Sequence, residues 1–291
     1  MSKFALGTVN FGLDYGISST SGYISPEEVK KVLNYASSKD INFLDTAYDY
    51  GVSEKILGKS NILDFNVITK TRNFENLSTN DDHLRYLKND FESSLSNLKL
   101  DKVYAVLIHN SEDLLKPYAK KLFDELKYLK KSKKIKKIGV SVYDYIQLQS
   151  IIDRFDIDIV QIPINIFDKR MIESGMIDKL KKKNIEVHAR SIFLQGLLLM
   201  SEKNRPTKFN NWNSLWKLWD EWLSDNKITA LEATTRYALS LTSISKIVVG
   251  VDNKCQLEEI ILASKGKLPQ IPNELSTNDV DLLNPSNWNK L

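Results

Sequence analysis

The sequence has one cysteine, Cys255, and only three histidines among its 291 residues. A single thiol excludes an intramolecular disulfide and a cysteine-based metal cluster. So few imidazoles also argue against a histidine-rich metal centre. We therefore expect no bound metal.

Long apolar runs are absent as well. No run approaches the roughly 18 apolar residues of a membrane span. The first residues, MSKFALGTVNFG, lack the apolar core of a signal peptide. We expect a cytoplasmic protein with no membrane partner.

The chain has little excess charge of either sign. Its 41 basic and 37 acidic side chains leave a net charge of +4, too balanced to indicate nucleic-acid binding. The lysine run at 127–137 (KYLKKSKKIKK) contains one aromatic residue, Tyr128, and acidic residues elsewhere balance it. A solvated surface is the simpler interpretation, so we expect no nucleic-acid partner.

Short β-rich runs alternate with helical patterns along the whole length, which favours parallel βα units. The predicted strands are Phe4–Val9, Asn42–Ala47, Phe65–Lys70, Val103–His109, Lys137–Val142, Ile159–Ile164, Glu186–Ile192 and Lys246–Val251. The predicted helices begin with one from about Ser25, followed by Ser53–Leu57, Asp81–Leu98, Pro117–Lys131, Tyr145–Arg154, Glu173–Lys183, Lys227–Leu241 and Gln256–Ala263. Ser25-Pro26 supplies an N-cap and a proline at the first helical position.

Eight such units in one chain predict a single (β/α)8 TIM barrel over residues 1–291. The rival, a doubly wound open sheet, needs a glycine-rich phosphate loop after the first strand. GTVNFG at 7–12 does not match G-x-G-x-x-G. One segment, at about 200–226, departs from the βα rhythm and is predicted to be an insertion.

Four ionisable residues follow or end neighbouring strands: Asp45 and Tyr50 after the second, Lys70 at the third and His109 at the fourth. Strand ends converge at one face of a barrel, so these side chains are expected to share a pocket. A lysine beside a phenol lowers the phenol's pKa, and a carboxylate keeps the lysine charged. A histidine donates a hydrogen bond or passes a proton. The set suits protonation of an alkoxide as a carbonyl is reduced.

The run DTAYDYGVSEKILG, with ITK, LIHN, GVS, Gln161, LQGLL and a late VG…QLEE, resembles the aldo-keto reductase superfamily from Gly7 to about Glu259. The resemblance implies that Tyr50 is the general acid and that Asp45, Lys70 and His109 assist it. It also implies a small-molecule carbonyl substrate and NADPH as cofactor, with NADH as the alternative.

The resemblance further assigns a nucleotide site. Ser141 and Gln161 match the residues that hold the nicotinamide amide, 194–197 the pyrophosphate loop and 250–259 the adenosine segment. The implied cofactor-binding residues are Gly7, Thr8, Asp45, Ser141, Gln161, Arg190, Ser191, Leu194, Gln195, Gly196, Gly250, Asp252, Lys254, Gln256 and Glu259.

Several positions depart from the family pattern. Val142 replaces a frequent Asn, and Arg190 replaces the usual aromatic residue that stacks on the nicotinamide. Asp252 and Asn253 stand where Ser and Arg are common. An acid is unfavourable near a 2′-phosphate and favourable near a 2′-hydroxyl, although Lys254 offers a compensating charge. NADPH remains the first expectation.

Three details, VNFGLDYGI, GVSVYD and RSIFLQGLLL, resemble a bacterial branch associated with polysaccharide and sugar biosynthesis. They imply a sugar-derived carbonyl substrate. Candidate pocket residues are Asn10, Tyr15, Tyr48 and Trp212. Tyr48 is not the expected acid, because the motif places that residue immediately before Gly51.

Four tryptophans, Trp212, Trp216, Trp219 and Trp222, recur on one helical face. They are expected to pack against the barrel, or alternatively to form a lid over the site. Two other functions stay open: a non-catalytic, nucleotide-binding regulatory subunit that senses redox state, and a barrel lyase or isomerase. Nothing in the sequence indicates the oligomeric state.

Overall fold

The computed structural model describes residues 2–17, 24–75, 77 and 82–291, and its centre is a closed barrel of eight parallel strands. Each strand pairs with the next in sequence, and β1 closes the ring against β8. The strands are β1 (Phe4–Gly7), β2 (Phe43–Asp45), β3 (Asn66–Lys70), β4 (Val103–Ile108), β5 (Ile135–Ser141), β6 (Ile159–Pro163), β7 (Glu186–Arg190) and β8 (Lys246–Gly250). The predicted TIM-barrel fold is confirmed.

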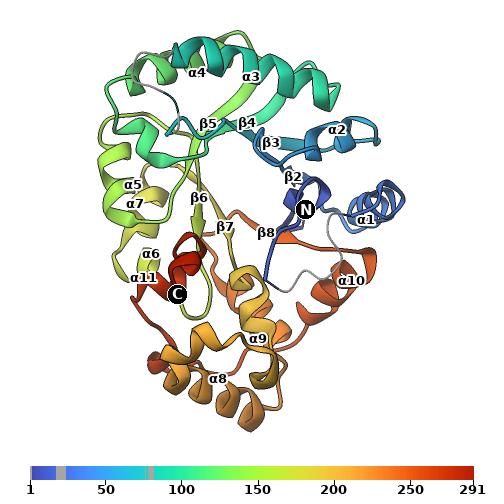
Figure 1. Ribbon diagram of the computed structural model, residues 1–291, viewed down its shortest axis with the longest axis vertical. Helices are drawn as coiled ribbons and strands as arrows, with labels where there is room; N and C mark the ends of the chain where they lie inside the picture. The colour runs from blue at the N-terminus through green and yellow to red at the C-terminus, as the bar shows by residue number, and fades with distance from the viewer. Residues whose placement is uncertain (1, 18–23, 76, 78–81) are drawn as a thin grey trace.

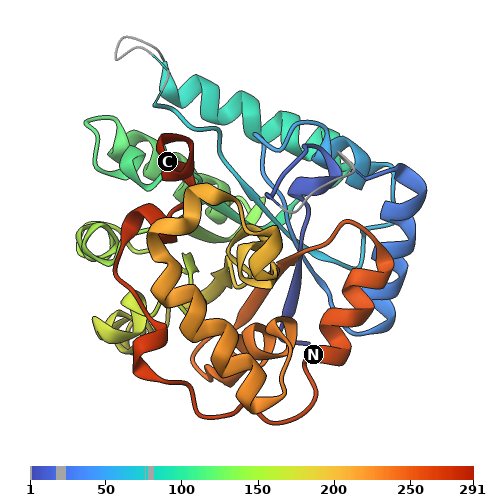
Figure 2. The same cartoon turned by 60° about the horizontal axis from the view of Figure 1, so that its bottom comes forward.

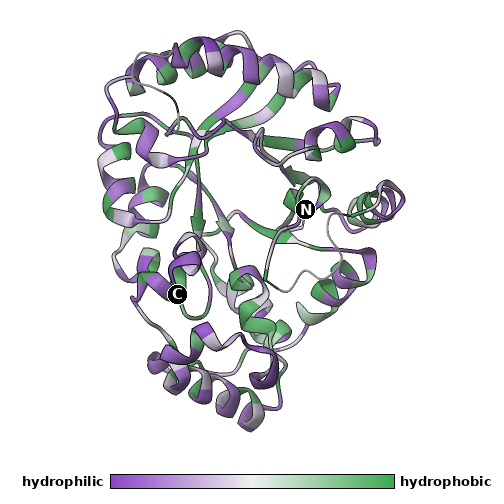
Figure 3. Ribbon diagram, in the orientation of Figure 1, coloured by the Kyte–Doolittle hydropathy of each residue, from purple (hydrophilic) through white to green (hydrophobic). Residues whose placement is uncertain are grey.

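Helices surround the strands (Figure 1). They are α1 (Pro26–Ser38), α2 (Ser53–Gly58), α3 (His83–Leu98), α4 (Ala119–Lys131), α5 (Tyr145–Ile152), α6 (Arg170–Glu173), α7 (Met176–Lys182), α8 (Asn213–Asn226), α9 (Ala230–Ser240), α10 (Lys254–Ala263) and α11 (Val280–Leu283). The Ser25 hydroxyl accepts from the Glu28 amide and caps α1, as its sequence predicts. Most helices carry apolar and polar residues on different faces (Figure 3).

Element ends differ from the sequence prediction where the backbone turns. β1 stops at Gly7 because Val9–Phe11 forms a 3-10 turn, and β7 stops at Arg190 because Ser191 has a φ of 59°. The helix predicted at 173–183 begins only at Met176, as α7, because Gly175 before it has a φ of +71°, and the short helix α6 precedes it. Asp81, the predicted start of another helix, lies outside the described residues.

Side chains that point inward fill the barrel interior below the level of its mouth. Ala5, Phe43, Ile68, Ala105, Leu107 and Ile159 form this buried cluster, separate from the larger core between strands and helices. Such a packed interior leaves no pore along the barrel axis. A ligand must therefore bind above this layer, at the mouth.

Residues 200–226 contain two 3-10 turns and α8, at the edge of the molecule in Figure 1. Trp216, Trp219 and Trp222 are buried, and the first two pack on Phe167. None of these three lines the large cavity at the barrel mouth, so packing, not a lid, describes this face.

The C-terminal segment, red in Figures 1 and 2, leads from α10 on one side of the barrel past α8 to α11 on the other. The Thr277 amide donates to the Phe167 carbonyl (3.0 Å), and Pro285 and Ser286 reach the cavity at the mouth. In the described part of the chain, no helix is long and apolar enough to cross a membrane.

Candidate active site

The ionisable residues predicted from the sequence occupy one layer above the buried cluster of the barrel. Side chains alternate along a strand, so the residue two places beyond an inward-pointing one also faces inward. Asp45 follows Phe43, Lys70 follows Ile68, His109 follows Leu107 and Gln161 follows Ile159. The strand register thus brings together residues that are far apart in sequence.

Two glycines fix the loop that carries Tyr50. Gly51 has a φ of +57°, and a Cβ there would lie 2.5 Å from the Gly12 carbonyl oxygen. A Cβ on Gly12 would lie 2.1 Å from the Tyr50 carbonyl oxygen. Only glycine permits this contact between the loops after β1 and β2. The requirement for glycine directly after Tyr50 in the motif is therefore steric.

Lys70 forms the centre of the polar layer. Its Nζ donates to Asp45 Oδ2 (2.7 Å) and to the Thr46 carbonyl (3.1 Å), and it lies 3.4 Å from Tyr50 Oη. Gln161 Nε2 donates to the other Asp45 oxygen (2.8 Å). Asp45 thus holds both the ammonium and the amide in place.

The titration of this group differs in one respect from the sequence expectation. Burial, and after it the charge of Asp45, raise the pKa of the Tyr50 phenol well above its usual value. Burial also lowers the pKa of the Lys70 ammonium, and Asp45 opposes that effect. The pKa of Tyr50 is thus raised, not lowered as the sequence predicted, because burial decides its direction. Tyr50 therefore carries its proton at neutral pH.

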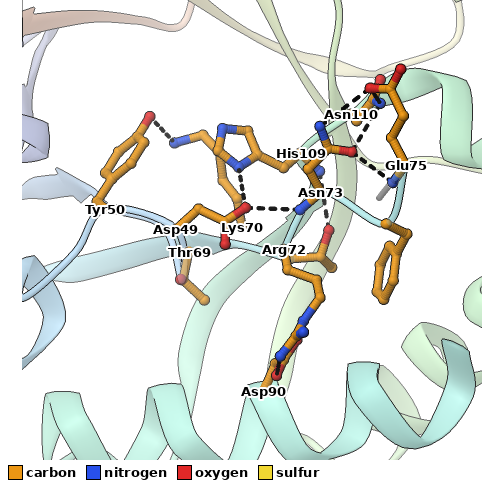
Figure 4. A network of polar contacts seen from close by, with 12 residues as sticks. Asp49, Tyr50, Thr69, Lys70, Arg72, Asn73, Glu75, Asp90, His109 and Asn110 are labelled. Carbon is orange, nitrogen blue, oxygen red and sulfur yellow. Dashed lines mark hydrogen bonds and ion pairs between the residues drawn. The ribbon is translucent and has the colours of Figure 1, made fainter. Parts of the chain in front are cut away.

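His109 stands beside the phenol, with its ring centroid 5.7 Å from that of Tyr50 in an edge-to-face arrangement. Burial and the charge of Lys70 lower the pKa of His109 to about 3. The ring is therefore neutral at physiological pH. Figure 4 shows His109, Tyr50 and Lys70 around the same space.

A cavity of about 1020 Å³ opens at this end of the barrel. Its size lies at the upper end for small-molecule and cofactor sites. The sequence-predicted residues that line it are Gly7, Thr8, Asn10, Tyr15, Asp45, Tyr50, Lys70, His109, Ser141, Gln161, Arg190, Ser191, Gln195, Gly196, Gly250, Asp252, Gln256 and Glu259. Most of the predicted site is thus gathered around one cavity.

Four predicted residues do not line the cavity. Leu194 belongs to a loop that lines the cavity, but its own side chain is buried in the core. Lys254 is on α10 but its ammonium pairs with Glu258 at 2.9 Å.

The other two are aromatic. Tyr48 turns away from the cavity, and its hydroxyl accepts from Arg72 Nη2 (3.3 Å), which also binds Asp90. Trp212 donates from its indole nitrogen to Asp279 Oδ2 (2.9 Å). Tyr48 was predicted because it lies in the loop after the second strand, and Trp212 because it belongs to the tryptophan face that was the candidate lid. Neither position in the sequence fixes the direction of the side chain.

Sequence reasoning missed several wall residues. Tyr143 follows Ser141 just past β5, and its place beyond the end of a strand could have identified it. Ile17, Phe193, Leu199, Pro285 and Ser286 also line the cavity. No local signal marks Pro285 and Ser286, because only the return of the C-terminal segment brings them there.

Arg190 and Tyr143 both line the cavity and contact each other. The Arg190 guanidinium carbon is 3.9 Å from the Tyr143 ring centroid, and Arg190 Nη2 donates to the Val142 carbonyl (3.2 Å). Tyr143 therefore holds the guanidinium by stacking. The loop beyond Arg190 has positive φ at Ser191, Leu194 and Gln195, a strained conformation of the cavity wall.

Asp252 lies just beyond β8 and lines the cavity wall. Its carboxylate accepts from Asn10 Nδ2 (2.5 Å) and Gln256 Nε2 (3.3 Å). At the start of α10, the Lys254 amide donates to Glu28 Oε1 (2.8 Å). Two carboxylates, Asp252 and Glu259, therefore belong to this part of the wall. Within the residues that the structure describes, no group of three or more His, Cys, Asp or Glu side chains is arranged to hold a metal ion.

Residues 3–273 match the Aldo/keto reductase family. The chain belongs to this family. As an aldo/keto reductase, it is an NAD(P)H-dependent oxidoreductase that uses a nicotinamide cofactor and acts on small carbonyl substrates. No match is found among curated protein sequences.

Solved structures of other aldo/keto reductases share the fold. Aldo-keto reductase AKR11C1 from Bacillus halodurans, in its holo form, is 20% identical with a TM-score of 0.73, over 92% of this chain and 88% of that chain. The glycerol dehydrogenase AKR11B4 from Gluconobacter oxydans is 21% identical with a TM-score of 0.69, over 93% and 88%. The thermostable aldo-keto reductase Tm1743, in complex with the inhibitor epalrestat, is 22% identical with a TM-score of 0.67, over 94% and 93%.

Proposed function

We propose that the protein reduces an aldehyde or ketone to the alcohol, with Tyr50 as the general acid. The observation that carries this proposal is the contact of Lys70 Nζ with both Asp45 (2.7 Å) and Tyr50 (3.4 Å) at the cavity wall. Tyr50 gives its proton to the substrate oxygen, and the ammonium stabilises the phenolate that remains. Asp45 keeps Lys70 charged and oriented. His109, whose ring is edge-to-face with that of Tyr50, contacts the same substrate.

The cavity residues fit a nicotinamide dinucleotide. Ser141 and Gln161 provide buried polar groups that line the cavity, and a Cβ added to Gly250 would meet no atom within 4 Å, which leaves space at the end of β8. When bound, the dinucleotide supplies the hydride for the carbonyl carbon. The barrel residues orient the two reactants and exclude water from the centre.

We propose NADH, rather than the NADPH implied by family habit, as the preferred cofactor. Asp252 and Glu259 line the cavity in the segment that resembles the adenosine-binding one. The Lys254 ammonium is engaged by Glu258, and the Lys254 amide by Glu28. A ribose 2′-hydroxyl can donate to a carboxylate, whereas a 2′-phosphate would be repelled.

A sugar-derived carbonyl compound is the proposed substrate. Besides the catalytic group, the cavity offers polar side chains from Tyr15, Gln195, Ser201 and Asn204. These groups suit a substrate with several hydroxyls. We also propose a cytoplasmic location, as expected from the sequence.

Nucleotide binding and carbonyl turnover test the proposed function together. Quenching of protein fluorescence with NADH and NADPH gives the two dissociation constants, and a panel of aldehydes, ketones and keto-sugars gives turnover. We expect tighter binding of NADH and reduction of at least one hydroxylated carbonyl compound. No binding of either nucleotide would contradict the proposal, and binding without any turnover would favour a regulatory subunit.

A further inference from the structure

The loop that carries Tyr50 is attached to the neighbouring loops on two sides. On one side, Gly51 lies so close to Gly12 of the loop after β1 that neither position has room for a Cβ. On the other side, the Tyr48 backbone amide donates to the Lys70 carbonyl at the end of β3 (3.1 Å). Tyr50 therefore stands between two attachments, and the second of them also involves side chains.

Arg72, two residues beyond Lys70, supplies the side-chain attachment. Its guanidinium carbon lies 5.2 Å from the centroid of the Tyr48 ring, and its Nη2 donates to the Tyr48 hydroxyl at 3.3 Å. A planar guanidinium stacks on an aromatic face and is attracted to its electrons, so the contact fixes the ring as well as the hydroxyl. Arg72 thus holds the residue two places before Tyr50.

Asp90 on α3 in turn fixes the guanidinium. Arg72 Nε donates to Asp90 Oδ2 (2.5 Å) and Nη2 donates to Oδ1 (2.6 Å), and such a bidentate pair permits one orientation of the two planes. The Asp90 side chain is 6% exposed, and the ring of Tyr86 on the same helix covers the guanidinium at 4.7 Å. Figure 4 shows Arg72 extending from the strand ends to Asp90. The loop of Tyr50 is therefore connected through Arg72 to a rigid helix.

The position of this loop matters because the contact between Tyr50 and Lys70 is long. Lys70 Nζ and Tyr50 Oη lie 3.4 Å apart, near the limit for a hydrogen bond. A small shift of the loop away from β3 would break the contact. In the proposed function, the ammonium stabilises the phenolate that remains after proton transfer. The reactivity of Tyr50 therefore depends on what holds its loop against β3.

We propose that Arg72 is a positioning residue whose ion pair with Asp90 anchors the loop of Tyr50 to α3 and keeps the phenol within reach of Lys70. Arg72 acts through the Tyr48 ring, and neither residue lines the cavity. The inference rests on the proposed function, in which Tyr50 is the general acid. It predicts that Arg72 affects the chemical step and not the binding of the nucleotide.

Arg72→Met keeps an unbranched side chain and removes the guanidinium. Rapid mixing of the enzyme–NADH complex with a carbonyl substrate measures the single-turnover rate, which separates chemistry from product release. We expect this rate to fall by about 10-fold or more, because a small misplacement of a catalytic group slows the reaction strongly. The dissociation constant of NADH, measured by fluorescence, should stay within about 3-fold of the wild-type value.

Arg170 provides the matched control for a loss of stability. It also forms a bidentate ion pair, in which Nε and Nη2 donate to the two oxygens of Asp168 (2.8 Å each), and the Asp168 side chain is 1% exposed. Arg170 lies on α6 and does not line the cavity. Arg170→Met should lower the melting temperature as Arg72→Met does but leave the single-turnover rate within about 3-fold of the wild type.

Two variants at position 48 test the path through the ring and decide the question if Arg72→Met does not fold. Tyr48→Phe keeps the ring over the guanidinium, so its single-turnover rate should stay close to that of the wild type. Tyr48→Leu removes the ring and leaves the ion pair intact, so it should lose rate as Arg72→Met does. The double variant Arg72→Met with Tyr48→Leu should lose no more than Arg72→Met alone, because the two residues act as a unit.

The results distinguish this inference from the proposed function. An unchanged single-turnover rate in Arg72→Met or in Tyr48→Leu would overturn the role of Arg72 while leaving carbonyl reduction intact. Equal losses in Arg72→Met and Arg170→Met, or additive losses in the double variant, would overturn it as well. Absence of turnover by the wild type with every carbonyl compound would instead contradict the proposed function, and this inference with it.

Discussion

The ammonium of Lys70 and the carboxylate of Asp45 lie 2.7 Å apart, and their side chains are only 1% and 6% exposed. The pair joins β3 to β2 at the level of the cavity floor. Two charges in this position are stable only together, since either one alone would be a buried, uncompensated charge. The site therefore depends on an ion pair that also links two neighbouring strands of the barrel.

Removal of one partner should destabilise the fold. Lys70→Met is expected to lower the free energy of unfolding by about 3–5 kcal/mol, because it leaves Asp45 charged and buried. Urea denaturation measures the change. The double variant Lys70→Met with Asp45→Asn should be more stable than the sum of the single variants predicts. Additive effects would show that the two groups do not interact.

The titration of His109 predicts a stability that depends on pH. Its pKa is about 3 in the folded protein, against 6.5 in the unfolded chain, so the unfolded chain binds the extra proton between these values. The free energy of unfolding should therefore fall as pH decreases from 6.5 towards 3. His109→Asn should show a shallower decrease in melting temperature over this window. Parallel curves for both proteins would contradict the low pKa.

The tryptophan face of α8 should contribute to stability. Trp219 is 0% exposed and donates to the Leu198 carbonyl (3.3 Å). Trp219→Ala should reduce the free energy of unfolding by about 3–5 kcal/mol, the usual cost of a large core truncation. The partly exposed Trp212 is the control, and Trp212→Ala should cost clearly less. A large increase in KM for Trp212→Ala with unchanged stability would favour the lid instead.

Asp252 should determine the choice between NADH and NADPH. Replacement by Asn keeps the shape and removes the charge near the proposed 2′ position. One like-charge contact at close range costs more than the about 1.4 kcal/mol of a tenfold change in affinity. NADPH should therefore bind about 10-fold more tightly or better to Asp252→Asn, with little change for NADH. Glu221→Gln, on α8 and outside the cavity, is the control, and equal effects of both variants on NADPH would contradict the assignment.

Local patterns predicted the fold, and together with the family resemblance they predicted candidate residues most of which line one cavity. The strand-end positions of Asp45, Lys70 and His109 follow from side-chain alternation, and Tyr50 follows from its place before Gly51. Contacts between segments that are far apart in the sequence could not be predicted in this way. The contact of Asn10 with Asp252 joins residues 242 positions apart, and no pattern near either residue indicates it.

Electrostatics was harder to predict than position. The sequence indicates that Lys70 lies near Tyr50, but burial, which decides the direction of the Tyr50 pKa shift, is a property of the folded cavity. Likewise, the direction of Tyr48 depends on Arg72, which comes from the end of another strand. Two neighbouring phenols therefore differ in environment although they share a motif.

Comparison of Tyr50→Phe with Tyr48→Phe tests the central claim most directly. Each variant loses one hydroxyl, and Tyr48 is the matched control because it lies two residues away and outside the cavity. With a carbonyl substrate and NADH, Tyr50→Phe should lose about 10²–10⁴-fold in kcat and keep its nucleotide affinity, whereas Tyr48→Phe should stay within about 3-fold of the wild type. Full turnover by Tyr50→Phe, or its loss in Tyr48→Phe alone, would contradict the account.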